Sequence, residues 1–261
     1  MNETPNHADF TNAPPRPELG TRAATQNMSL ALNTLYDAMD AGARAPRLAL
    51  FYGPSGYGKT EGSCHAASIT NAAYVSAREV WSGKNFLEAL CFELGILRTP
   101  PTASKMVDAI VQQLTTSPQP IIIDEMDYLV KKATVDIIRD IHDAVDVAIM
   151  MIGMEQLPAR LKEWEQFDNR IISVTAAQPT SIDDGRLLRD VYVQKITLED
   201  DLVDYFTKAT NGCARRIVNN LYKAQRVAVD ELGTLHIDRK AWGNRTVLNG
   251  DVPIRRTAGL R

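Results

Sequence analysis

The chain has 261 residues, 44% of them hydrophobic and 23% charged, so it can bury a sizeable core and has the composition of an ordinary globular protein. Its formal net charge of −3 excludes a uniformly basic surface, so any site for nucleic acid has to be a local patch. No apolar stretch is long enough to span a membrane, and the first ten residues lack the pattern of a secretory signal, which predicts a cytoplasmic protein.

The cysteines offer neither a disulfide framework nor a zinc site. Cys64, Cys91 and Cys213 are odd in number, far apart and without the CxxC or Cys/His spacing that metal ligands show. We interpret them as reduced and mostly buried thiols.

The first elements along the chain are an arm and a helix. Residues 1–27 contain four prolines among Asn, Thr and Ala, a composition that buries too little apolar surface to order itself and so predicts a flexible N-terminal arm. From Met28 the apolar residues follow an amphipathic helical pattern, which predicts a helix before the first strand.

Strands and helices then alternate. The continuous apolar runs 48–52 and 120–124 are typical of parallel strands buried on both faces, and shorter strands are predicted at 73–76 and 147–152. Helices are predicted at 59–71, 84–94, 105–114, 131–145 and 156–165. This alternation predicts an α/β core over residues 28–178, a doubly wound parallel sheet flanked by helices.

Beyond residue 179 the pattern becomes helical. Helices predicted at 198–210 and 214–232 indicate a small α-helical lid over residues 179–240, followed by a basic C-terminal tail, 241–261. From residue 239 onward one acid, Asp251, stands against six basic residues: Arg239, Lys240, Arg245, Arg255, Arg256 and Arg261. Such a tail either touches DNA or a partner protein, or is a solvated terminus.

A glycine-rich loop follows the first strand. Its sequence, Gly53-Pro54-Ser55-Gly56-Tyr57-Gly58-Lys59-Thr60, matches G-x-x-x-x-G-K-[ST] in full, between a predicted strand and a predicted helix. In such a Walker A loop the backbone N–H groups wrap a phosphate, the lysine reaches the β- and γ-phosphates of ATP and the Thr hydroxyl holds Mg²⁺. A glycine-rich turn without a ligand is the alternative.

Two acids close the strand 120–124. Asp124 and Glu125 follow the loop by about 65 residues, where a Walker B pair would lie beside the phosphates. Asp124 would bind Mg²⁺ through water, and Glu125 would act as a general base on the attacking water. An acidic strand end that caps the next helix is the alternative. Asp127 is a weaker candidate for the site, and we interpret it as a solvated acid.

These motifs, the element order and the lid together resemble the AAA+ ATPase family, from about Met28 to Leu232. The resemblance implies hydrolysis of ATP to ADP and phosphate with Mg²⁺. It also implies a role for the lid segment 211–216 (NGCARR), which resembles the sensor 2 motif of initiator-type members. Arg215 would contact the γ-phosphate there, whereas surface charge is the alternative for Arg215 and its neighbour Arg216.

The family resemblance also implies an arginine finger that enters the ATP site of a neighbouring subunit, and hence an oligomer. Arg170, in the segment 166–170 (QFDNR), occupies the corresponding place after the fourth predicted strand and its helix. Arg160 is a competing candidate, and a structural salt bridge is the other interpretation of Arg170.

The fourth strand departs from the family pattern. Most AAA+ proteins place a polar sensor 1 residue at its end, where this chain has Met154, followed by Glu155. A methionine side chain cannot orient a water by donating a hydrogen bond. Unless Glu155 substitutes, we expect slow, partner-stimulated hydrolysis, suited to a switch more than to a motor.

Residues 149–157 (IMMIGMEQL) and the compact lid resemble the transposition ATPases, the B proteins of Mu-like phages and their transposon counterparts. That resemblance implies helical filaments on double-stranded DNA, without sequence preference, that deliver target DNA to a DDE-type transposase in a bacterial or phage-infected cell. We expect the roughly 45 residues before the first strand to be too few for the N-terminal helix-turn-helix domain of that group plus the leading helix.

DNA contacts would then fall to loops of the core. The candidates are Lys84, Lys105, Lys131 and Lys132, each of which could equally be a solvated surface charge. Repeated along an assembly, weak phosphate contacts would sum to salt-sensitive binding. Two other functions stay open, a helicase-loader or initiator-like AAA+ ATPase and a nucleotide-gated adaptor that binds proteins alone.

Overall fold

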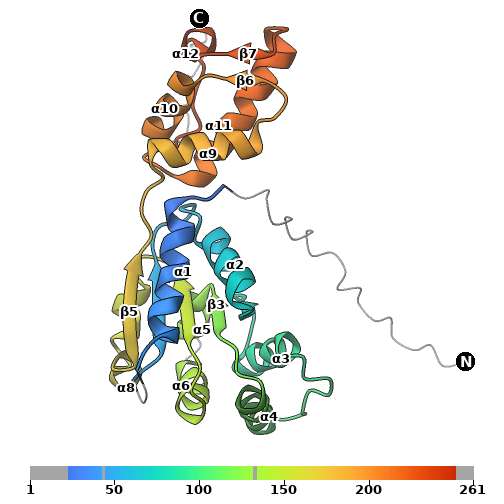
Figure 1. Cartoon of the computed structure of the whole chain (residues 1–261), viewed down its shortest axis with the longest axis vertical. Coiled ribbons are helices and arrows are strands. Elements are labelled where there is room, and N and C mark those ends of the chain that lie inside the picture. Colours follow the sequence, from blue (N-terminus) through green and yellow to red (C-terminus); the bar gives the residue numbers. More distant parts are fainter. Residues whose placement is uncertain (1–22, 43–44, 132–133, 251–261) are drawn as a thin grey trace, which may run out of the picture.

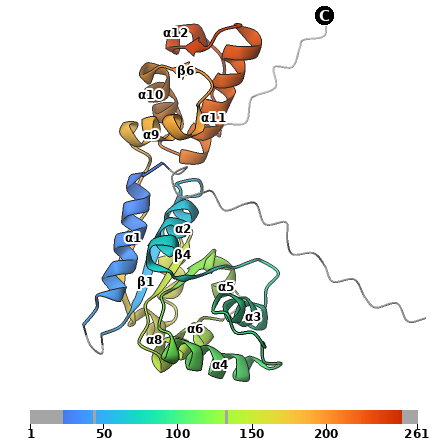
Figure 2. The ribbon, with the colours of Figure 1, turned by 45° about the vertical axis from the view of Figure 1, so that its right-hand side comes forward.

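The computed structural model describes residues 23–42, 45–131 and 134–250. A parallel sheet flanked by helices forms the larger part of the molecule, and a helical part lies beyond one end of that sheet (Figures 1 and 2). In the described residues, no helix combines the length and the apolar composition needed to cross a membrane.

The sheet is parallel, with the strand order β2-β3-β4-β1-β5. Its strands are β1 (Leu48–Tyr52), β2 (Ala73–Ser76), β3 (Ile121–Asp124), β4 (Ile149–Gly153) and β5 (Ile171–Ala176). The helices of this part are α1 (Gln26–Met39), α2 (Lys59–Thr70), α3 (Gly83–Glu93), α4 (Ala103–Thr116), α5 (Met126–Lys131), α6 (Val135–Ala144), α7 (Leu157–Leu161) and α8 (Glu165–Asp168).

Both faces of the sheet are buried, which explains why its central strands are apolar throughout. Successive side chains of a strand point to opposite faces. On one face Phe51 and Ile152 pack with α1 and α2, and on the other Leu50 and Met151 pack with α3 to α8. The parallel, helix-flanked sheet predicted from the sequence is therefore confirmed.

Several boundaries differ from the prediction. The helix predicted at 131–145 corresponds to α6, with residues 132–133 outside the described part, and the short helix α5 before it was not predicted. The helix predicted at 156–165 is divided into α7 and α8. Strand β5 was not predicted: it lies at the edge of the sheet, where Ile172 and Val174 are about half exposed, so it lacks the continuous apolar run of a central strand.

The helical part contains α9 (Ile182–Tyr192), which was not predicted, α10 (Asp200–Ala209) and α11 (Ala214–Arg226). The last of these continues as a π-helix, Val227–Glu231. Two short parallel strands, β6 (Thr197–Leu198) and β7 (His236–Ile237), and α12 (Arg239–Trp242) complete it. Its core is centred on Phe206 and Trp242, whose ring centroids are 5.1 Å apart in an edge-to-face arrangement.

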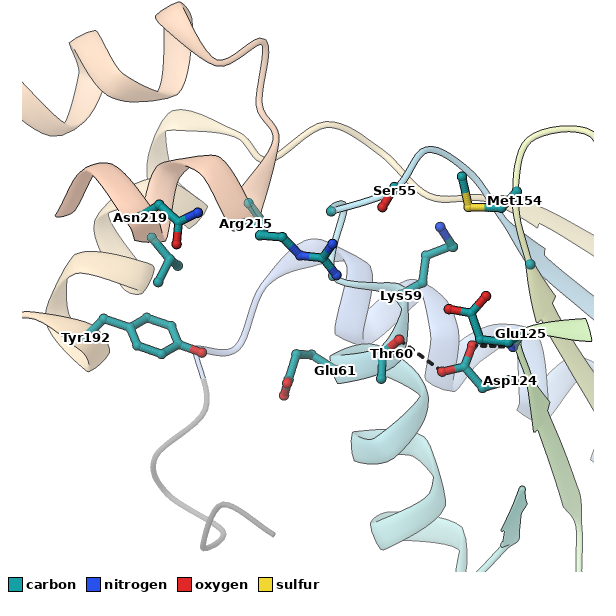
Figure 3. Close-up of a pocket in the computed structure, with 15 residues that line it drawn as sticks. Ser55, Lys59, Thr60, Glu61, Asp124, Glu125, Met154, Tyr192, Arg215 and Asn219 are labelled. Atoms are coloured by element: carbon teal, nitrogen blue, oxygen red, sulfur yellow. Dashed lines mark hydrogen bonds between the residues drawn. The ribbon is translucent and has the colours of Figure 1, made fainter. Parts of the chain in front are cut away.

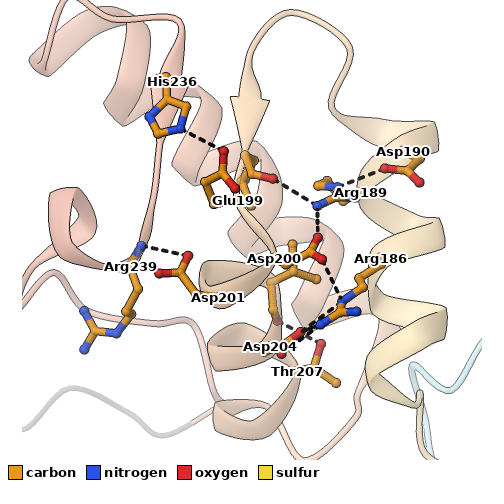
Figure 4. A network of polar contacts seen from close by, with 12 residues as sticks. Arg186, Arg189, Asp190, Glu199, Asp200, Asp201, Asp204, Thr207, His236 and Arg239 are labelled. Atoms are coloured by element: carbon orange, nitrogen blue, oxygen red, sulfur yellow. Dashed lines mark hydrogen bonds and ion pairs between the residues drawn. The ribbon is translucent and has the colours of Figure 1, made fainter.

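A rim of ion pairs joins the elements of this part (Figure 4). Arg186 of α9 binds Asp204 of α10 through two nitrogens, while Arg189 binds Asp200 and the Leu198 carbonyl. Because these side chains are partly exposed, each pair contributes about 1 kcal/mol or less. We therefore assign the stability of the lid mainly to its apolar core.

The last described segment, 244–250, runs back along α11, and we call it the strap. The amide of the fully buried Asn220 donates to the Leu248 carbonyl and accepts from the Leu248 N–H, at 3.1 and 2.9 Å. Lys223 donates to the Thr246 carbonyl, and Arg216 donates to the Asn249 carbonyl. The strap is thus antiparallel to α11 and ends beside the first turn of that helix.

The three cysteines are free, with Cys91 and Cys213 buried and Cys64 half-buried, as predicted. Most of the predicted N-terminal arm and the end of the predicted tail, including Arg255, Arg256 and Arg261, lie outside the described residues. Arg245 pairs with Glu231 of the π-helix.

Candidate active site

The glycine-rich loop leads from β1 into α2 through left-handed backbone at two glycines. Gly56 and Gly58 have φ angles of 83° and 79°, which favour glycine over other residues. Gly58 is also the N-cap residue of α2. At Gly56 a Cβ atom would lie 2.7 Å from the Cys213 sulfur of the lid, so the loop can approach the lid only because this residue is glycine.

Lys59 is the first residue of α2 and is buried against the loop. Its ammonium donates to the carbonyls of Gly53 and Pro54, at 2.6 and 2.8 Å. Burial lowers the pKa of Lys59, while the charges of Asp124 and Glu125 act in the opposite direction. The ammonium therefore lies inside the loop, where it could exchange carbonyl partners for phosphate oxygens.

Asp124 lies at the end of β3 and is only 3% exposed. One of its carboxylate oxygens, Oδ2, accepts from the Thr60 hydroxyl at 3.0 Å and from the Tyr74 hydroxyl at 2.7 Å. The other oxygen, Oδ1, accepts from the Glu125 N–H at 2.8 Å. Burial and the Asp124 charge raise the pKa of Tyr74, so its hydroxyl acts as a donor here.

These oxygens fit a Mg²⁺ site. Carboxylate and hydroxyl oxygens are ligands that Mg²⁺ accepts, and this ion usually completes its shell with waters and phosphates instead of an all-protein cage. Among the described residues, no group of three or more Asp, Glu, His or Cys side chains is placed to hold a metal ion by itself. Thr60 and Asp124 would hold the ion, which would neutralise phosphate charge.

Glu125 faces the same pocket. Burial raises the pKa of its carboxyl, and the neighbouring Asp124 acts in the same direction, while Lys59 and Arg215 lower it. A carboxylate with a raised pKa that stands beside bound phosphates is suited to accept a proton from water.

The lid closes the pocket from the other side (Figure 3). The pocket has a volume of about 360 Å³. Its lid residues are Tyr192, Ala214, Arg215, Val218 and Asn219. The Arg215 N–H donates to the Gly56 carbonyl at 3.1 Å, and its guanidinium extends toward the loop. The structure thus brings Arg215 together with Lys59, Thr60, Asp124 and Glu125, all of which the sequence singled out.

Arg160 and Asp127 form a fixed pair at the end of β4. Arg160 donates to an Asp127 carboxylate oxygen at 3.0 Å, and the other oxygen accepts from the Met154 N–H at 2.7 Å. Asp127 is therefore a bound acid, not the solvated one interpreted from the sequence. Met154 itself, directly after β4, lines the pocket with an apolar side chain.

Asn27 is a site residue that the sequence analysis missed. Its side-chain amide donates to the carbonyls of Tyr57 and Gln178, both at 2.7 Å, and accepts from the Gln178 N–H at 2.8 Å. It thereby joins the start of α1, the glycine-rich loop and the connection to the lid. The sequence analysis placed Asn27 in the flexible arm 1–27, whereas the structure has it buried in the first turn of α1.

The remaining predicted residues lie away from the pocket. Arg170 directly precedes β5, at the end of the sheet where the strands begin, whereas the glycine-rich loop lies at the end where β1 finishes. Its guanidinium donates to both carboxylate oxygens of Asp143, each at 2.6 Å. Lys84 and Lys105 are exposed in the first turns of α3 and α4, and Lys84 lies 3.7 Å from Glu88. The Lys131 side chain and Lys132 fall outside the described residues.

Residues 43–161 match a protein-family model described as an AAA domain. The ORC2 protein of Aeropyrum pernix in its ADP form is 17% identical, with a TM-score of 0.64 over 92% of this chain and 72% of that chain. The Aeropyrum pernix ORC1 protein in complex with DNA is 20% identical, with a TM-score of 0.59 over 82% of this chain and 62% of that chain. Cdc6p from Pyrobaculum aerophilum is 16% identical, with a TM-score of 0.59 over 85% of this chain and 66% of that chain.

No curated protein sequence matches the chain. None of the structures described above is of a transposition protein, so the expected kinship with transposition ATPases gains no support from them. Identities this low show a shared fold. With the glycine-rich loop, the paired acids and the lid in place, the chain has the AAA+ α/β fold, with residues 43–161 matching an AAA domain, and it is similar in structure to archaeal ORC and Cdc6 proteins.

Proposed function

We propose that the protein is a nucleotide-switched ATPase of the initiator-like type, which binds ATP with Mg²⁺ between core and lid and acts on double-stranded DNA. The observation that carries the proposal is the position of Arg215. It belongs to the lid, yet its backbone N–H binds the glycine-rich loop and its side chain extends into the pocket. A phosphate in the pocket would therefore be contacted by both parts of the molecule.

The composition of the pocket favours a switch over a fast motor. Lys59 and Arg215 supply positive charge for the phosphates, and Glu125 supplies a base. Met154, in contrast, places an apolar side chain where a polar group would help to orient the attacking water. We infer slow hydrolysis, so that the ATP-bound state persists long enough to direct an assembly.

DNA is the partner that the comparisons favour, because the ORC1 structure that shares this fold is a complex with DNA. The net charge of −3 restricts such binding to a local patch. Lys84 and Lys105 remain candidates for that patch. Delivery of DNA to a DDE-type transposase has in its support the sequence resemblance of residues 149–157 and of the compact lid, and we do not favour it.

The test is duplex binding by fluorescence anisotropy with a non-hydrolysable ATP analogue, with ADP and without nucleotide, across a salt series. We expect the affinity to differ between the ATP analogue and ADP, and to fall with salt by about 0.9 logarithmic units per decade for each phosphate contact. Arg215→Ala should abolish the difference between nucleotides. Arg226→Ala, an exposed arginine at the other end of α11, should keep it.

Equal affinity in all three nucleotide states would reject the switch. Absence of DNA binding at low salt would favour the protein adaptor instead. Long filaments on DNA in electron micrographs, as opposed to discrete assemblies, would return the transposition ATPases to first place.

A further inference from the structure

We infer that Tyr74 is a positioning residue for Mg²⁺, and that its hydroxyl fixes the orientation of the Asp124 carboxylate. The inference rests on nucleotide binding in the pocket proposed above. Tyr74 is the second residue of β2 and pairs with Ile122 of β3. It lies 50 residues from Asp124 in sequence, and it does not line the pocket itself.

The geometry around Asp124 carries the inference. The carboxylate is almost completely buried and has three donors from three different places: the Thr60 hydroxyl at the start of α2, the Tyr74 hydroxyl on β2 and the Glu125 N–H. Thr60 and Tyr74 share one oxygen, while Glu125 has the other. The carboxylate cannot rotate without breaking at least one of these bonds.

The count of acceptor positions shows what the Tyr74 hydroxyl achieves. An ionised carboxylate offers about four acceptor positions, so three donors leave one, on the oxygen bound by Glu125. Thr60 gives its only proton to Asp124 and keeps its lone pairs for a cation. Without Tyr74 a second position would open on the shared oxygen, and the carboxylate could turn toward water in more than one way.

A purely structural role is the competing explanation, because a buried tyrosine hydroxyl needs a partner in any case. The two explanations differ in what they predict for the metal. A structural role affects nucleotide binding with and without Mg²⁺ alike. A positioning role affects only the part of the affinity that depends on the metal.

The experiment is calorimetric titration of the full chain with a non-hydrolysable ATP analogue, in excess EDTA and in a series of Mg²⁺ concentrations. Removing a partner of a metal ligand typically costs about 10- to 100-fold in metal affinity. We therefore expect Tyr74→Phe to raise the Mg²⁺ concentration for half-maximal effect by about tenfold or more, with unchanged affinity in EDTA.

Tyr52→Phe is the matched control, because Tyr52 is also a half-buried strand tyrosine and forms no side-chain hydrogen bond to the described residues. It should leave the Mg²⁺ response unchanged. Since each variant is compared with itself in EDTA, a loss of stability in Tyr74→Phe does not obscure the result.

An unchanged Mg²⁺ response in Tyr74→Phe would overturn the inference, and so would an equal loss of affinity in EDTA and in Mg²⁺. If the unsubstituted protein binds the analogue with no response to Mg²⁺, the inference fails while nucleotide binding stands. If it binds no analogue at all, the proposed function fails with it.

Discussion

Glu125 adopts a left-handed backbone conformation, with φ of 56°. For a residue with a side chain this conformation costs about 1–2 kcal/mol. The same turn aims the Glu125 N–H at Asp124 and lets the carboxyl face the pocket. Backbone strain of this kind tends to occur at functional positions, where the surrounding structure holds it in place.

For Glu125 we predict that the Gln variant binds ATP but hydrolyses it about 10²- to 10⁴-fold more slowly, because the amide cannot accept the proton of the attacking water. Single-turnover measurement of phosphate release checks this. Turnover close to that of the unsubstituted protein would place the base elsewhere.

The pH dependence of hydrolysis follows from the direction of the Glu125 shift. Burial raises the pKa of this carboxyl, so the base becomes protonated at a higher pH than an ordinary glutamate, whose pKa is about 4.3. Hydrolysis by the unsubstituted protein should therefore decrease as the pH falls through that raised pKa. The residual activity of the Gln variant should lack this decrease.

The sequence identifies Lys59, Thr60, Asp124 and Glu125 because each stands in a short local motif. Tyr74 and Asn27 have no such motif: their roles arise from contacts with residues that are distant along the chain. Only the packing of β2 against β3, and of α1 against the lid connection, brings those partners together.

Among the elements, α1 connects the glycine-rich loop with the lid. Asn27 binds the glycine-rich loop and the connection to the lid, and the Gln26 N–H donates to the buried Asp184 carboxylate of α9. The start of α1 is therefore bonded to the core loop and to the lid at once. Its position should affect how the two close on a nucleotide.

Asn27→Ala should lower the free energy of unfolding by about 1–3 kcal/mol, because the buried Asn27 amide forms three hydrogen bonds, to partly buried backbone groups of Tyr57 and Gln178, that the variant loses. It should also weaken nucleotide binding. Asn33→Ala, at an exposed position of the same helix, should change the free energy of unfolding by about 0.5 kcal/mol or less. Urea denaturation measures the free energy of unfolding of both variants. Equal losses in Asn27→Ala and Asn33→Ala would contradict the role of Asn27.

The sequence predicts the central elements better than the edge elements. β1 and β3 are covered on both faces, so they carry continuous apolar runs that stand out from their surroundings. Among the described residues β5 pairs with β1 alone, and α9 presents a polar, ion-paired face, so the apolar signal of each is diluted. The helix α5 was not predicted, because its six residues are too few to show a helical period.

At the scale of the whole molecule, Arg170 cannot act on the pocket of its own chain. It lies where the strands β1 and β5 begin, whereas the pocket lies at the other end of β1. Its bond to Asp143 holds the pKa of that carboxyl below its usual value. Only a neighbouring subunit could place a nucleotide near Arg170, and the pair with Asp143 would have to open or shift for that contact.

The prediction for an arginine finger is that Arg170→Ala binds ATP normally but hydrolyses it poorly, and that mixing it with Lys59→Ala restores part of the activity. A mixed interface would join an intact pocket from one variant to an intact finger from the other. Arg139→Ala removes a comparable ion-paired arginine of the same region and should retain activity. No recovery at any ratio, with oligomers demonstrated by light scattering, would confine Arg170 to a structural pair.

The arrangement of the strap sets the order in which its hydrogen bonds would break under a pulling force. It lies antiparallel to α11 and ends against Arg216, next to the arginine that reaches the pocket. A pull on the C-terminal end would thus load the bond at Asn249 first, then the two at Leu248, and last the two at Thr246. Bonds loaded in succession yield to a smaller force than bonds loaded together, so a partner that grips this end could peel the strap open from the side nearest the nucleotide.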